Sequence, residues 1–221
     1  MKSLLLLFVP VCLLFSCKKD DTIPANEDIT SGSRWGIMIG STPEQVYGQL
    51  QDLPGGLGVK AVYSLPRHQY VKVSDFQGNP ALYNTFMIHQ IDSAGVVQIE
   101  YNNNISRIRW SGPDGIYPLQ RWPAGTTAYL SVGDGGAALQ TKMSEIFKAW
   151  PYHGNYEISM GNKPLTSGFD LEMKKWDTWQ FATSAPVSAT AKGVYVVTLH
   201  FSSGKLGRIN LQYQETPSMI E

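Results

Sequence analysis

The chain has 221 residues, with 18 basic and 18 acidic side chains, so its formal net charge at neutral pH is zero. This balance implies no broad basic face of the kind that nucleic-acid binding needs, so we expect no nucleic-acid partner. The length is enough for one large domain or two small ones whose cores need no disulfide support.

The amino terminus predicts an export signal. Lys2 gives a basic start, the run Leu4–Phe15 is apolar, and Ser16 precedes Cys17. The apolar run is too short to cross a bilayer, which needs about 20 residues. We therefore expect residues 1–16 to be a signal peptide that is removed from the mature protein.

The four residues Leu14-Phe15-Ser16-Cys17 resemble the lipobox of bacterial lipoproteins. The resemblance implies that Cys17 takes a diacylglycerol, becomes the first residue and is acylated, commonly with palmitate. Cys12 leaves with the signal peptide, so Cys17 is the single cysteine of the mature chain, and a covalent role explains it best. An ordinary secretory signal with an incidental Cys17 is the alternative.

The residues after Cys17 predict a tether. Lys18-Lys19-Asp20-Asp21 keeps this segment solvated, and it also resembles the charged export signal that one group of Gram-negative bacteria uses for surface lipoproteins. The stretch Thr22–Ser33 is polar, so residues 17–34 are expected to be flexible and the fold to begin near Trp35. We expect an outer-membrane location, with the periplasmic and cell-surface sides both open.

Two helix starts about ninety residues apart suggest an internal repeat. In the first, Thr42 is the expected N-cap, Pro43 takes the first helical position and Gln45 completes a capping box. In the second, Asp134 is the expected N-cap of a helix whose apolar residues include Leu139 and Met143.

Segments with strand-like patterning follow each helix. In the first half they are Val59–Ser64, Tyr70–Ser74, Leu82–Asp92, Val96–Tyr101 and Ile105–Ser111, and in the second Tyr156–Met160, Leu171–Thr183, Val194–Phe201 and Leu206–Tyr213. The alternation of apolar and polar residues in the closing hairpin of each half predicts sheets with one buried and one wet face.

The expected fold class is α+β, with two tandem units at residues 35–118 and 119–221, each an amphipathic helix packed on an antiparallel sheet. Chance similarity between common caps and hairpins is the alternative. Each unit resembles the small outer-membrane assembly lipoproteins, and two in tandem resemble the secreted β-lactamase inhibitor proteins. The resemblance implies binding to a protein, but it carries over no binding residue.

Catalytic motifs are weak in this sequence. The Gly-x-Ser-x-Gly turn of serine hydrolases is absent, and the four histidines are scattered, so we expect no metal site and no cofactor. His200 is expected on the wet side of a strand. Asp134-Gly135-Gly136 fits a helix cap better than an ion or phosphate loop. The carboxylates Asp170, Glu172 and Asp177 fit either a glycosidase pair or a solvated sheet surface.

Aromatic density is the more suggestive feature, because 6 Trp and 11 Tyr exceed what burial obviously demands. Aromatic side chains dominate protein-binding hot spots and also stack on sugars. The candidate binding residues are Trp122, Trp150, Tyr152, Trp176 and Trp179, with burial in the core as the alternative for most of them. We therefore expect a membrane-anchored, non-catalytic module for a protein or peptide partner. The rivals are a surface glycan-binding protein that uses Trp122, Trp176 or Trp179, and a hydrolase with an unrecognised site.

Overall fold

The structure is a computed structural model that describes residues 26–64, 68–70, 75, 77–90, 95–149, 156–186 and 191–217. The signal peptide, Cys17, Trp150 and Tyr152 lie outside these residues. The described chain is mostly β-sheet with two α-helices, α1 (Pro43–Gln51) and α2 (Leu139–Ala149). Neither helix is long and apolar enough to span a membrane.

The strands are β1 (Asn26–Ile29), β2 (Ser33–Arg34), β3 (Ile37–Met38), β4 (Ala61–Ser64), β5 (His68–Tyr70), β6 (Thr85–Gln90), β7 (Val96–Asn102), β8 (Asn104–Gly112), β9 (Gly115–Leu119), β10 (Arg121–Trp122), β11 (Leu130–Ser131), β12 (Tyr156–Pro164), β13 (Thr178–Pro186), β14 (Ala191–Ser202) and β15 (Lys205–Pro217). Short 3-10 helices are η1 (Gly55–Leu57), η3 (Pro80–Leu82), η4 (Gly136–Ala138) and η5 (Leu171–Lys175).

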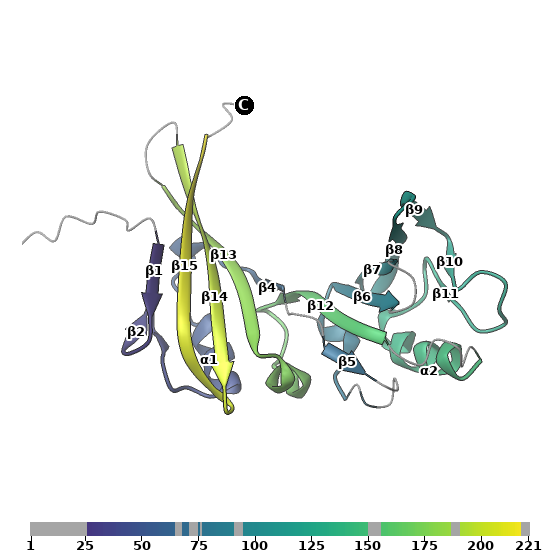
Figure 1. Ribbon diagram of the computed structural model, residues 1–221, viewed down its shortest axis with the longest axis horizontal. Helices are drawn as coiled ribbons and strands as arrows, with labels where there is room; N and C mark the ends of the chain where they lie inside the picture. Colours follow the sequence, from purple (N-terminus) through teal and green to yellow (C-terminus); the bar gives the residue numbers. More distant parts are fainter. Residues whose placement is uncertain are drawn as a thin grey trace, which may run out of the picture.

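One 11-stranded sheet organises the molecule, in the order β1-β15-β14-β13-β4-β12-β6-β7-β8-β9, with β5 also paired to β12. Figure 1 shows β13 to β15 at one end and β6 to β9 at the other, joined by β4 and β12. Strand β12 belongs to the second half of the sequence but lies between β4 and β6 of the first half. The prediction of two tandem helix-on-sheet units is therefore wrong, because strands of both halves interleave in a single sheet.

The two helices also cross between the halves of the sequence (Figure 1). Helix α1 contacts β15, and its Tyr47 packs on Phe169 with ring centroids 5.7 Å apart. The turn that leads into α2 is bonded to the β7–β8 hairpin, where Gly136 N donates to Asn103 O at 2.6 Å. Each helix thus contacts an element of the other half, α1 contacting β15 and α2 contacting η3, and the buried apolar side chains form one core cluster.

The folded part begins earlier than the sequence predicted. Strand β1 pairs with β15 from Asn26↔Gln212 to Ile29↔Ile209, so residues 26–34 are not all tether. Ile29 packs against the core, and the charged Asp28 bonds to Arg208 at 2.6 Å. The polar composition that suggested a flexible segment instead suits an edge strand, which has one side in water.

The start of α1 confirms its predicted cap. The Thr42 hydroxyl accepts a hydrogen bond from Gln45 N, and the Gln45 side chain accepts one from Thr42 N at 2.9 Å. Pro43 occupies the first turn, where its missing N–H costs nothing. This reciprocal pair satisfies two amide groups that the helix leaves open.

The predicted cap of α2 is wrong. Asp134 lies before η4, where its carboxylate accepts a hydrogen bond from Ser131 N at 2.7 Å and pairs with Lys142 at 2.7 Å. It closes the turn after β11 and reaches forward to the helix, while Gly135 precedes η4 without a side-chain cap. The prediction failed because the 3-10 helix η4 lies between Asp134 and α2, so Asp134 stabilises the preceding turn and does not cap the helix.

The two closing hairpins form as predicted. Strands β7 and β8 pair around Asn103, and β14 and β15 pair around Ser203 and Gly204. All three turn residues have positive φ, between 50° and 72°, which suits asparagine and glycine. The segment Leu171–Thr183 differs from the prediction, because residues 171–175 form η5 and the strand begins only at Thr178. The Asp170 carboxylate caps η5 by accepting from Glu172 N.

Candidate functional site

The structure places three of the five candidate aromatic residues in the core. Trp122, Trp176 and Trp179 are 6%, 2% and 0% exposed. Trp179 alternates inward on β13, where its ring lies 4.6 Å from that of Phe201. These rings are therefore covered, and they offer no surface to a protein or to a stacked sugar. Trp150 and Tyr152 lie outside the described residues.

A buried polar cluster that the sequence analysis missed lies between α1 and the middle of the sheet. Its centre is Lys163 of β12, which has no solvent exposure. The ammonium donates to Tyr47 Oη at 3.0 Å, to Gly168 O at 2.6 Å and to the Ser167 hydroxyl. Burial lowers the pKa of Lys163 to about 8, against the opposing effect of the Asp170 charge.

Two carboxylates, Asp170 and Glu172, complete this cluster, and both are buried, so the solvated sheet surface that was one of their two predicted alternatives is wrong. Asp170 accepts from Asn79 N at 3.0 Å, and Glu172 accepts from Gln77 N at 2.9 Å and pairs with Lys175 at 3.1 Å. Burial, and then the Asp170 charge, raise the pKa of Tyr83 beside them. These bonds attach residues 77–83 to residues 163–172, which are distant in the sequence.

A lysine against a serine hydroxyl is also an arrangement that can activate a nucleophile. Here the Lys163 ammonium is fully used by its three acceptors, and the Ser167 hydroxyl lies 2.7 Å from Pro164 O. Together they hold the loop after β12 against α1. The contacts explain the cluster as a structural joint in this fold, and we assign it no catalytic role.

The remaining sequence candidates are dispersed. His200 lies half-buried on β14, where burial and then the charge of Arg208 lower its pKa. Asp177 is exposed, and its carbonyl accepts from Phe201 N. Among the described residues, no three His, Cys, Asp or Glu side chains lie close enough to hold a metal ion.

The surface that remains is the side of β6 to β9 that faces away from the core. Its alternation follows from β7, where Val97 and Ile99 are fully buried while Gln98 and Glu100 are half-exposed. We call this surface the open face. It consists of Thr85, Met87, His89, Val96, Gln98, Glu100, Arg107, Arg109, Ser111, Ile116 and Pro118.

Strand register arranges the open face in rows. One row runs Thr85↔Glu100↔Arg107, and the next runs from Gln98 to Arg109 on the neighbouring strand. Glu100 is the single carboxylate of the open face. It pairs with Arg107 at 3.6 Å and with Arg109, and it accepts from Gln98 Nε2 at 3.2 Å.

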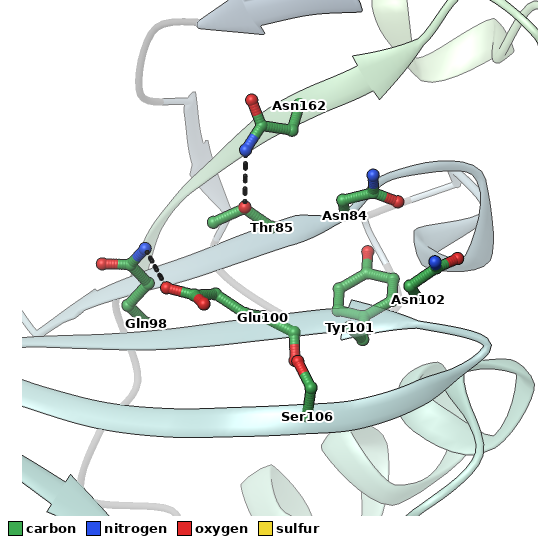
Figure 2. Close-up of a pocket in the computed structure, with 8 residues that line it drawn as sticks. All are labelled: Asn84, Thr85, Gln98, Glu100, Tyr101, Asn102, Ser106 and Asn162. Atoms are coloured by element: carbon green, nitrogen blue, oxygen red, sulfur yellow. Dashed lines mark hydrogen bonds between the residues drawn. The ribbon is translucent and has the colours of Figure 1, made fainter. Parts of the chain in front are cut away.

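Beside these rows the sheet is hollowed, as Figure 2 shows. The hollow is open and holds about 350 Å³. Its lining is Asn84, Thr85, Gln98, Glu100, Tyr101, Asn102, Ser106 and Asn162. The Asn162 side chain reaches across to the Thr85 hydroxyl at 3.3 Å, and φ of Asn162 is 50° (Figure 2). This left-handed backbone lets Asn162 face the hollow while Lys163 turns into the core.

The sequence contained part of this site. The alternation in residues 97–101 and 105–110 predicted a wet face. Glu100 and the two arginines Arg107 and Arg109 carry opposite charges in these segments, and pairing the segments as a hairpin brings them together. The place of these strands within the 11-stranded sheet depends on long-range pairings, which no local pattern reveals.

Comparisons of the chain with protein-family models, with curated proteins and with solved structures find no match. The resemblances to lipoproteins and to inhibitor proteins therefore stay predictions.

Proposed function

We propose that the protein is a lipid-anchored, non-catalytic binding module of the cell envelope that docks a protein partner on the open face. The observation that carries the proposal is the side of β6 to β9 that faces away from the buried core, where Arg107 and Ile116 are exposed. A sheet face that combines arginines with half-buried and exposed apolar side chains is typical of protein-binding surfaces.

The size of this surface supports a macromolecular partner. From β6 across to β9 the open face is about 14 Å wide, given about 4.8 Å between strands. The hollow within it is open rather than enclosed, whereas small-molecule sites bury most of their ligand. A partner that spans several strands would use the whole face, and the hollow would take one protruding group.

The expected lipid on Cys17 supplies the second part of the proposal. Anchoring in the outer membrane confines the protein to the bilayer surface, so a partner in the same membrane meets it at high effective concentration. A modest affinity at the open face is then enough. The tether predicted for residues 17–34 loses its last part to β1 and β2, and a tether before β1 would keep the anchor separate from β6 to β9, which lie at the far end of the sheet.

Photocrosslinking in the native host tests this proposal. The residue p-benzoylphenylalanine replaces Gln98 on the open face or, as a control, the exposed Gln140 on α2. We expect irradiation to give a discrete adduct from position 98 and none from position 140. No adduct at 98, or the same adducts at both positions, would contradict a docking role for the open face.

A further inference from the structure

The open face has a surplus of positive charge and of hydrogen-bond donors. Arg107 and Arg109 both pair with Glu100, so two cations face one carboxylate. Each guanidinium carries five N–H donors, whereas a carboxylate accepts about four hydrogen bonds. Gln98 uses a further position on Glu100, so most arginine donors find no acceptor on that carboxylate.

Two observations show that Glu100 does not use all of these donors. The Arg107 side chain is 56% exposed, and it contacts Glu100 at the longer distance of 3.6 Å. The Nε of Arg109 is buried and has no hydrogen-bond partner in the described part of the protein. A buried donor without a partner costs free energy, so Glu100 alone does not satisfy the Arg109 guanidinium.

An apolar position, formed by Val96 and Ile116, lies beside the two arginines. These two residues flank Ser111 on the neighbouring strands, and Ser111 is two residues beyond Arg109 on β8. Ile116 is 66% exposed, which is unusual for a large aliphatic side chain. Alternate residues of a strand lie about 7 Å apart on one face, so the apolar position is about 7 Å from Arg109.

From this juxtaposition we propose that the open face binds an acidic, extended segment of a partner protein. A carboxylate side chain of the segment pairs with Arg109, and Arg107 adds positive charge two residues earlier on the same strand. The side chain two residues further on is aliphatic and packs between Val96 and Ile116. Charge complementarity selects the acidic residue, and the matching spacing of about 7 Å in an extended peptide selects its aliphatic neighbour. This inference rests on the proposed function and specifies the partner's chemistry.

Immobilised peptides provide the test, with the full mature lipoprotein in detergent micelles as analyte. The probe peptide is blocked at both ends and has the order Ser-Glu-Thr-Leu-Ser, and its controls replace the glutamate by glutamine or the leucine by serine. We expect the probe to bind about tenfold more tightly than either control, which corresponds to about 1.4 kcal/mol. Absence of probe binding, or equal binding of the glutamine control, would overturn the proposal.

Variants of the protein separate recognition from folding. Replacing both arginines (Arg107→Gln with Arg109→Gln) should weaken probe binding about tenfold, whereas Arg208→Gln at the other end of the sheet should leave it unchanged. Glu100→Gln removes the competing carboxylate, so it should bind the probe more tightly. A structural defect would weaken probe binding and would not strengthen it. Weaker binding by Glu100→Gln would therefore refute the proposed pairing of the segment with the arginines.

Two further outcomes distinguish the proposals. Polygalacturonate is the probe for an acidic glycan, and tighter binding of its uronate units than of the peptide would overturn the assignment to a protein segment. If the adduct at position 98 persists in the double arginine variant while the peptides fail to bind, the open face docks a partner but the acidic segment is wrong. If the protein that carries the crosslinker at position 98 and keeps both arginines gives no adduct, the proposed docking role of the open face is itself wrong.

Discussion

Replacement of Lys163 by methionine tests the buried joint through its pH dependence. The folded pKa of Lys163 is about 8, whereas the value in the unfolded chain is 10.5. Below about pH 8 both states carry the proton, so the free energy of unfolding does not change with pH on account of this group. Between about pH 8 and 10.5 the unfolded chain binds more protons, and the stability of the folded protein therefore rises with pH.

The size of the effect follows from the two values. Each pH unit within the window changes the free energy of unfolding by about 1.4 kcal/mol, so the rise from pH 8 to pH 10 is about 2–3 kcal/mol. Lys163→Met lacks the titrating group but keeps a side chain of similar length. Tyrosines that ionise in this range are present in both proteins, so their contributions largely cancel in the difference.

Urea unfolding of the mature protein and of Lys163→Met at pH 7, 8, 9 and 10 measures this difference directly. The stability of the original protein relative to the variant should stay constant up to about pH 8 and then rise. Lys205→Met, at the exposed start of β15, is the matched control and should show no such rise. A flat difference for Lys163→Met would show that the ammonium is not desolvated and would refute the buried joint.

Three other substitutions test particular contacts. Thr42→Ala should lower the free energy of unfolding by about 1 kcal/mol in urea titrations, because α1 loses its capping box. Trp179→Ala should cost about 3–5 kcal/mol and lower partner binding only as far as it lowers the folded fraction, and full folding with lost binding would contradict its core role. Burial raises the pKa of Asp134, but the hydrogen bonds from Lys142 and Ser131 and the Lys142 charge outweigh it, so the folded pKa lies below 3.8. The advantage over Asp134→Asn should hold above about pH 4 and disappear as pH falls further, as thermal unfolding at pH 7 and pH 2 would show.

Local features of the fold could be predicted from the sequence. The capping box at Thr42 and the hairpin turns at Asn103 and Gly204 depend on residues within a few positions of one another. The segment 171–175 was mistaken for a strand because its apolar residues alternate, whereas the Asp170 side chain caps a 3-10 helix there. Turn chemistry outweighed the alternation at that point.

The arrangement of the sheet could not be predicted in the same way. The position of β12 between β4 and β6 joins residues about 70 to 100 positions apart, and no local pattern specifies such a pairing. The contacts of α1 with β15 and of α2 with η3 have the same origin, because each joins the two halves of the sequence. Trp179 shows the consequence for the candidate binding residues. The sequence left open whether its ring is buried, and the ring proves to face the core on β13, which is paired with β14.

Thiol labelling tests most directly whether the open face is occupied in the cell envelope. Gln98→Cys lies on the open face, and Thr198→Cys lies on the corresponding side of β14 at the other end of the sheet; both positions are half-buried. Acylation of Cys17 would leave the introduced thiol as the reactive one. The maleimide reaction at position 98 should be several-fold slower in native membranes than in the purified protein, while the rate at position 198 stays the same. Equal rates in both preparations at position 98, or slowing at position 198 alone, would contradict a partner on the open face.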